Sequence, residues 1–237
     1  MEKILFELSH KDRVRILKHL EKGPSRLTQI SNSLKINNVE ASRHLSRLSD
    51  VDMVTKTTEN EYALTNMSHL IMMLYHRMQF VVDNREFFIS HDITAYPMIV
   101  DNIDALSKAE MLTGFFEVVS LIKDVSVEAE EYLYVFSPSP MKDVAPINVE
   151  KAKKGVEVRI IYGTGSAIPP EYEGTEIKVR FNDNLKCAMK MNEKRGGMAF
   201  PLNDGTMDFT TVCTGGDGQL LSYLKNNFEK HWKESKP

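Results

Sequence analysis

The chain has 237 residues, of which 42% are hydrophobic and 27% charged, with a formal net charge of −3. This length exceeds one typical domain and indicates two, and the ordinary apolar fraction argues against a disordered chain. No apolar run approaches the ~20 residues that a membrane-spanning helix needs, and charges interrupt any signal-peptide core near the start. Two cysteines, Cys187 and Cys213, are too few for a disulfide framework. We therefore expect a cytoplasmic protein with reduced thiols and no membrane partner.

The charges are unevenly distributed along the chain. Residues 1–66 carry 11 Lys and Arg against 9 Asp and Glu, whereas residues 67–237 carry 19 against 24. A small basic head on an acidic body is typical of a protein that presents one end to nucleic acid. Because the asymmetry is mild, the local motifs carry the stronger indication.

The first 65 residues predict three helices followed by a hairpin. The first helix starts with Ser9 as its N-cap and Asp12 in its first turn, and it ends at Gly23-Pro24. Helices over residues 26–34 and 39–49 flank a polar turn at 35–38. Residues 53–56 and 62–65 predict two strands around a polar tip at 57–61.

The helix over residues 39–49 has an apolar and a polar face. Val39, Leu45 and Leu48 recur at helical spacing and should pack inward, with Ala41 and Ser42 allowing close approach. Such a polar face suits a DNA major groove, whose base edges Arg, Asn and Ser side chains read. The alternatives are a solvated charged face for the helix and a plain polar hairpin for the tip. The predicted DNA contacts are Asn38, Glu40, Ser42, Arg43, His44, Ser46 and Arg47 on the helix, and Lys56, Thr57, Thr58 and Asn60 on the hairpin.

Residues 13–65 resemble the winged helix-turn-helix of ArsR- and MarR-like regulators. Gln29-Ile30-Ser31, the run from Val39 to Leu45, and Met53-Val54 fall on the family's sequence rhythm. The resemblance implies double-stranded DNA as a partner, with residues 39–49 as the reading helix and the hairpin as the wing. The metal-binding Cys pair of metal-sensing ArsR proteins is missing. The resemblance therefore implies DNA-binding geometry without metal chemistry, and we expect no metal site.

A further helix, over residues 66–83, predicts self-association. Its apolar stripe is broader than one contact surface needs, and helix-turn-helix proteins commonly bind paired half-sites as two-fold dimers. We therefore expect a homodimer, with domains at residues 1–66 and 96–237 joined by a linker or dimerisation helix at 67–95. The stripe comprises Leu70, Ile71, Leu74, Tyr75, Met78, Val81 and Val82.

The second domain predicts an α/β fold, which makes the whole chain α+β. A long helix begins at Ser107, with Glu110 in the capping-box position, and runs to about residue 131. Strands at 132–136 and 156–162 around a helix at 149–154 predict a parallel βαβ unit. Further strands are expected at 177–181, 186–191, 198–202 and 209–214, with a closing helix at 220–233.

The segments YLYVF and KAKKGVEVRIIYG are similar to the first halves of phospholipase-D-like domains. Together with the winged head and residues 200–232, they make the chain resemble archaeal regulators with a methanogenesis-regulator type of effector domain. The sugar-sensing TrmB family is a looser relative. The resemblance implies that the second domain senses a ligand or mediates assembly.

The catalytic motif of phospholipase-D enzymes, H-x-K-x4-D, is missing. His10-Lys11-Asp12 has the wrong spacing, and His231-Trp232-Lys233 is not followed by the required Asp. We therefore expect no enzyme activity and no cofactor. We expect a ligand pocket at the carboxyl ends of the parallel strands, where Arg and Lys would favour a small anionic effector. Its candidate residues are Ser137, Tyr162, Arg180 and Lys186.

Three functions remain open from the sequence. The leading one is a sequence-specific, homodimeric DNA-binding transcription regulator that is modulated through its C-terminal sensor domain. The alternative is a DNA-associated phosphodiesterase or nuclease of the phospholipase-D-like class, which the missing histidine disfavours. The third is a winged helix used only for protein contacts, which the exposed Arg43 and Arg47 disfavour because a partner helix would want an apolar groove there.

Overall fold

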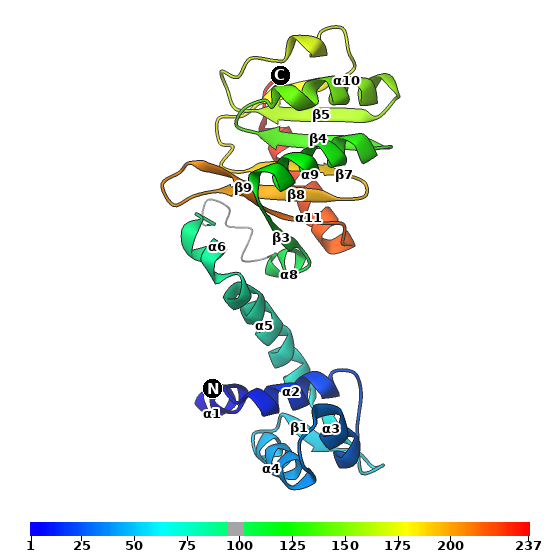
Figure 1. Ribbon diagram of the computed structural model, residues 1–237, viewed down its shortest axis with the longest axis vertical. Helices are drawn as coiled ribbons and strands as arrows, with labels where there is room; N and C mark the ends of the chain where they lie inside the picture. Colours follow the sequence, from blue (N-terminus) through cyan, green and yellow to red (C-terminus); the bar gives the residue numbers. More distant parts are fainter. Residues whose placement is uncertain (94–101) are drawn as a thin grey trace. The chain divides into compact units, whose positions relative to one another are not determined.

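The computed structural model describes residues 1–93 and 102–237 and divides into two compact units, Met1–Phe80 and Val81–Pro237 (Figure 1). The first unit thus includes most of the helix that we expected in a separate linker over residues 67–95. The expected boundary between residues 95 and 96 lies outside the described residues. Within the described ranges, no helix is both long and apolar enough to cross a membrane.

The first unit is a winged helix-turn-helix, as predicted. Strands β1 and β2 pair antiparallel, with Val54 opposite Leu64, and Ser25 adds an isolated bridge to Tyr62. The core joins all the long helices of the unit through fully buried side chains such as Ile16, Ile30, Leu45 and Met72. Its elements are α1 (Glu2–Leu8), α2 (Lys11–Leu20), α3 (Leu27–Leu34), α4 (Asn38–Ser49), β1 (Val54–Lys56), β2 (Tyr62–Leu64) and α5 (Asn66–Asp83).

The start of the chain differs from the prediction. Helix α2 is capped by His10 rather than Ser9, because Nδ1 of His10 accepts a hydrogen bond from the backbone N–H of Asp12 at 3.2 Å. Ser9 instead ends α1, a helix that we did not predict, and donates its hydroxyl to the carbonyl of Phe6. The available signal was the i, i+4 pair Ile4 and Leu8, which packs against the core of the unit.

The second unit contains a seven-stranded mixed sheet with the order β3-β9-β8-β7-β4-β5-β6 (Figure 1). Strands β4, β5 and β6 run parallel, and the remaining neighbours pair antiparallel, so the predicted parallel βαβ unit is confirmed. The strands are β3 (Glu110–Thr113), β4 (Tyr132–Ser137), β5 (Glu157–Tyr162), β6 (Lys178–Phe181), β7 (Ala188–Asn192), β8 (Gly196–Pro201) and β9 (Met207–Gly215).

Helices cover both faces of this sheet, and alternate residues of β4 separate the two faces. Leu133 belongs to the core beneath α9 (Phe115–Glu128) and α10 (Ala145–Lys153). Tyr134 lies on the opposite face, where its ring stacks on Phe228 of α11 with centroids 4.5 Å apart. The other described helical elements of this unit are α6 (Arg85–Ser90), α8 (Ile103–Leu106), η1 (Lys142–Val144), η2 (Pro170–Tyr172) and α11 (Gly218–Glu234).

The predicted long helix from Ser107 is wrong over its first part. Glu110–Thr113 forms the edge strand β3, in which Leu112 lies opposite Val212 of β9. The helix starts only at Phe115, after Gly114 adopts a φ of 125° that residues with side chains rarely reach. Pairing with β9 therefore overrides the helical pattern of this segment, as tertiary context often does for short elements.

Candidate nucleic-acid interface

Helix α4 is positioned by its cap and by one buried stripe. The side chain of Asn37 accepts a hydrogen bond from the backbone N–H of Glu40 at 2.8 Å and so caps the N-terminus. Ala41, Leu45 and Leu48 follow at i, i+4 and i+7 and are fully buried. The stripe leaves the opposite face of the helix to solvent.

That exposed face forms a shallow open groove on the first unit. Among the predicted DNA contacts on α4, those that line this groove are all exposed, whereas Glu40 lies outside it and is half-buried. Amide, hydroxyl and guanidinium groups of this kind hydrogen-bond to base edges and phosphates. The groove is lined by Asn38, Val39, Ser42, Arg43, Ser46 and Arg47.

Two predictions for α4 are wrong. Val39, expected inside, is 81% exposed, and His44, expected to face DNA, is only 2% exposed. The reason is the position of the buried stripe on the helix. His44 lies three residues after Ala41 and four before Leu48, which places it on the buried side, whereas Val39 lies off it.

The two arginines of the groove are held differently. Arg47 donates a hydrogen bond to Oε1 of Glu7 at 3.0 Å and lies over the ring of Phe6 at 5.3 Å. Glu7 is itself buried and pairs with buried Arg13 at 2.7 Å. Arg43 makes no ion pair with any residue in the described ranges and projects freely. Helix α1 therefore anchors one cation of the interface, a contribution that the sequence analysis missed.

The wing tip supplies a second polar surface. Lys56, Thr58 and Asn60 are exposed, as the prediction for DNA contacts requires. Asn60 turns the chain with a φ of 59°, a conformation that Asn tolerates better than most residues. Thr57 is half-buried, and its hydroxyl accepts a hydrogen bond from the backbone N–H of Glu61, so it closes the hairpin.

His44 lies beside His10 and Asp12 at the contact between α4 and α2. One ligand atom of each lies within 4.8 Å of the others, and the two imidazole rings are 4.7 Å apart. Nδ1 of His10 caps α2, and Asp12 pairs with Arg15 at 2.7 Å. Burial lowers the pKa of His44 below 6.5, and the neighbouring His10 lowers it further. We therefore assign this cluster a structural role, with His44 as a neutral side chain.

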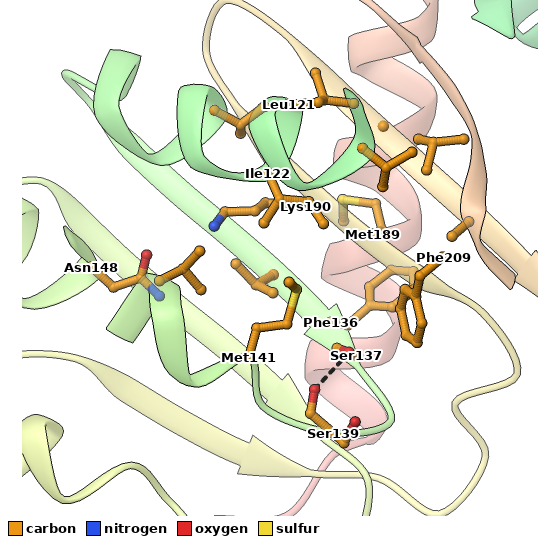
Figure 2. Close-up of a pocket in the computed structure, with 18 of the residues that line it drawn as sticks. Leu121, Ile122, Phe136, Ser137, Ser139, Met141, Asn148, Met189, Lys190 and Phe209 are labelled. Carbon is orange, nitrogen blue, oxygen red and sulfur yellow. Dashed lines mark hydrogen bonds between the residues drawn. The ribbon is translucent and has the colours of Figure 1, made fainter. Parts of the chain in front are cut away.

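The second unit contains a partly open cavity of about 70 Å³ between α9 and the sheet (Figure 2). Two of the four predicted ligand residues, Ser137 and Tyr162, line it. Nδ2 of Asn148, another lining residue, donates to the hydroxyl of Tyr172, which lies 3.5 Å from the hydroxyl of Tyr162. Burial raises the pKa of Tyr162, so this phenol stays protonated.

The other two predicted ligand residues do not belong to this cavity. Arg180 donates to the backbone carbonyl of Trp232 at 2.6 Å and lies over its ring, so it ties β6 to the end of α11. Lys186 is exposed and lies outside the cavity lining. The cation that does line the cavity is Lys190, which we did not predict. Its signal in the sequence is a lone charge within the otherwise apolar run from Cys187 to Met191.

Comparisons with known proteins agree with the fold of the first unit. Residues 10–56 match the model of the arsR family of bacterial regulatory proteins. The resemblance of the head to ArsR-like regulators is therefore confirmed, and the chain carries the DNA-binding segment of a transcription regulator. No curated protein matches the chain.

Several solved structures are similar to this chain at low identity. TrmBL2, an archaeal chromatin protein, is 11% identical over 96% of this chain and 94% of its own, with a TM-score of 0.45. NucT from Helicobacter pylori is 14% identical over 54% of this chain and 98% of its own, with a TM-score of 0.45. Nuc from Salmonella typhimurium, a phospholipase D family member, is 10% identical over 54% and 97%, with a TM-score of 0.43.

Proposed function

We propose that this protein is a homodimeric transcription regulator that binds double-stranded DNA through α4 and the wing. Its second unit acts as the sensor of a small anionic effector. The observation that carries the proposal is the exposed groove of α4, where Arg43 and the side chains around it are presented to solvent within an ArsR-type head. A helix with this polar face suits the major groove, and the exposed wing suits the adjacent phosphates.

The DNA contact is tested by fluorescence anisotropy with the protein's own promoter DNA at several salt concentrations. Arg43→Ala should weaken binding by at least about fivefold, since one good arginine contact is worth about 1–3 kcal/mol. Lys22→Ala is the matched control, because Lys22 is an exposed cation on the turn after α2. Unchanged binding of the Arg43 variant would remove α4 from the interface.

Self-association is supported by the exposed apolar side chains of α5. Leu70 is 64% and Met78 60% exposed, whereas Met72 of the same helix is buried in the head. An exposed apolar surface of this kind marks an interaction site, and a two-fold dimer matches paired DNA half-sites. Sedimentation at micromolar concentration should give a dimer that Leu70→Glu/Met78→Glu dissociates. His69→Glu, an exposed change on the same helix, should leave it intact.

The proposal includes no catalytic step. The residues that line the cavity within the described ranges include no His, which is the side chain that hydrolysis of the phospholipase-D type uses as its nucleophile. Incubation with a chromogenic phosphodiester should therefore give no turnover. Hydrolysis that cavity-filling substitutions abolish would instead support the nuclease alternative.

A further inference from the structure

The cavity beneath α9 is an apolar chamber in the middle of the sheet. Its roof is formed by side chains of α9, including Leu121 and Ile122, and its floor by β4, β7 and β8 (Figure 2). Val135 lies on β4, inside the sheet, and is nevertheless only half-buried, because it faces this open space. Exposed Ser139 also lines the cavity, so the chamber reaches the surface at the loop that follows β4.

Lys190 is the charged side chain of this chamber. It lies at the centre of β7, a strand whose five residues are all buried, and pairs with Val135 on one side and Gly197 on the other. The residue is 8% exposed, and its side chain runs beneath α9 (Figure 2). Its Nζ has no hydrogen-bond partner among the described residues.

A buried amine without a partner costs stability, and burial lowers the pKa of Lys190 to about 7. The other buried polar groups near this cavity, in contrast, do have hydrogen-bond partners. Ser126 donates to Asn148 at 3.0 Å, and Asn148 donates to Tyr172 at 2.9 Å. Packing alone would be served by methionine, the residue on both sides of Lys190. The amine is therefore a group in need of a counter-ion that the described lining residues do not supply.

We infer that this cavity binds a small aliphatic carboxylate, whose oxygens pair with Nζ of Lys190 and whose hydrocarbon part packs against the walls from α9 and β4. The inference rests on the proposed sensor function of the second unit and names the class of its effector. A single buried cation balances one negative charge, so a monoanion fits better than a phosphate dianion, whose second charge would stay unpaired between apolar walls.

The size of the cavity limits the ligand. A volume of about 70 Å³ is about half that of the ~150 Å³ apolar cavity that holds a benzene molecule. This leaves room for a carboxylate with a body of only a few carbons, so affinity should peak at ~2–4 carbons and fall for longer chains. Propionate lies within this range and serves as the probe.

The test is direct binding of propionate to the full-length protein without DNA, measured by saturation-transfer NMR and calorimetry. We expect saturable binding, at least tenfold weaker binding of propionamide, and loss of propionate binding in Lys190→Met. Lys153→Met, which removes an exposed lysine of α10, should bind as the wild type does. Equal binding of the amide, retained binding in Lys190→Met, or no saturable binding of any acid from acetate to hexanoate would overturn the inference.

A second variant guards against loss of folding. Val135→Phe fills the cavity and keeps the lysine, and fluorescence of the single tryptophan, Trp232, reports whether the second unit is folded. A folded Val135→Phe protein that binds propionate as tightly as the wild type would also overturn the site. Because these measurements use no DNA, their failure is distinct from failure of the Arg43→Ala test of the proposed function.

Discussion

The groove of α4 and the cavity beneath α9 place cations in opposite environments. Arg43 projects into water, where an unpaired charge costs nothing and attracts a polyanion in a salt-dependent way. Lys190 lies in an apolar chamber without a partner, where the same kind of charge weakens the fold until an anion arrives. In a third arrangement, Arg13 is buried but pairs with buried Glu7, so a carboxylate of the same chain offsets the cost of burying the cation. The partner of a cation, rather than the presence of the cation, therefore indicates its role.

The largest expected effect comes from breaking the buried pair. Glu7→Gln removes the negative charge beside buried Arg13, which keeps the backbone carbonyls of Phe6 and residue 7 as acceptors at 2.9 Å each. Removing one partner of a buried pair costs about 3–5 kcal/mol, and the two carbonyls place the loss near the lower end. Amide hydrogen exchange in α2 and α4 should show this loss of stability.

The matched control for Glu7 is an exposed pair in the second unit. Glu150 and Lys154 lie four residues apart on and just after α10, with both side chains more than half exposed. Glu150→Gln should leave hydrogen exchange unchanged in both units, because exposed pairs contribute little. Equal protection of the head in wild type and the Glu7 variant would show that the Glu7–Arg13 pair does not hold α1 and α2 together.

The next effect concerns Lys190 and pH. Because its pKa is about 7 in the folded protein and near 10.5 when unfolded, the unfolded state binds more protons between these values. The free energy of unfolding of the second unit should therefore rise with pH, by about 2 kcal/mol between pH 7 and pH 9. Below the folded pKa and above the unfolded pKa, the contribution of Lys190 to the free energy of unfolding does not change with pH. Denaturation followed by Trp232 fluorescence measures it.

Lys190→Met supplies the reference for that pH dependence. The variant lacks the titrating amine and should be more stable than the wild type at pH 7, with the difference shrinking as pH rises. Other titrating groups are shared by both proteins and cancel in the comparison. Parallel stability curves for the two proteins would mean that the amine is solvated or paired in solution.

Elements with a strong local pattern could be predicted from the sequence. The continuous apolar run of β4, the strand β5 and the two-faced helix α4 are found where expected. Which side chains of a helix face inward was harder to predict, because a rotation of the helix by one residue changes the buried face. The exchange of Val39 and His44 follows from the position of the buried stripe, which depends on how α4 packs against α2.

The ligand residues depended on partners far away in the chain. Arg180 satisfied the rule for the carboxyl end of a strand, but its guanidinium is taken by Trp232, 52 residues later. Lys190 could not be assigned to the cavity, because the sequence of a short strand does not show which of its two faces a helix covers. Long-range packing therefore decides the site, whereas local periodicity decides the elements.

A smaller effect separates the two arginines of α4. Arg47 already has Glu7 and the ring of Phe6 as partners, so binding a phosphate means sharing or breaking that contact. Arg47→Ala should weaken DNA binding by about 1 kcal/mol, less than Arg43→Ala does, within the usual range for one contact. Anisotropy titrations at matched salt compare the two. A larger loss for Arg47 would indicate that the Glu7 contact orients it for a base rather than competing with DNA.

The smallest effect concerns His44, whose pKa burial lowers below the ordinary 6.5. Below pH 6.5 the unfolded state takes up a proton that the folded head resists, so the stability of the head should fall as pH decreases. The loss is limited by the distance between the two pKa values, and it should appear between pH 7 and pH 5.5. Hydrogen exchange of α4 at pH 7 and pH 5.5 measures it, after correction for intrinsic rates. His44→Phe should remove this pH dependence, whereas His69→Asn, at an exposed histidine of α5, should keep it. Persistence of the full acid effect in His44→Phe would assign it to another group.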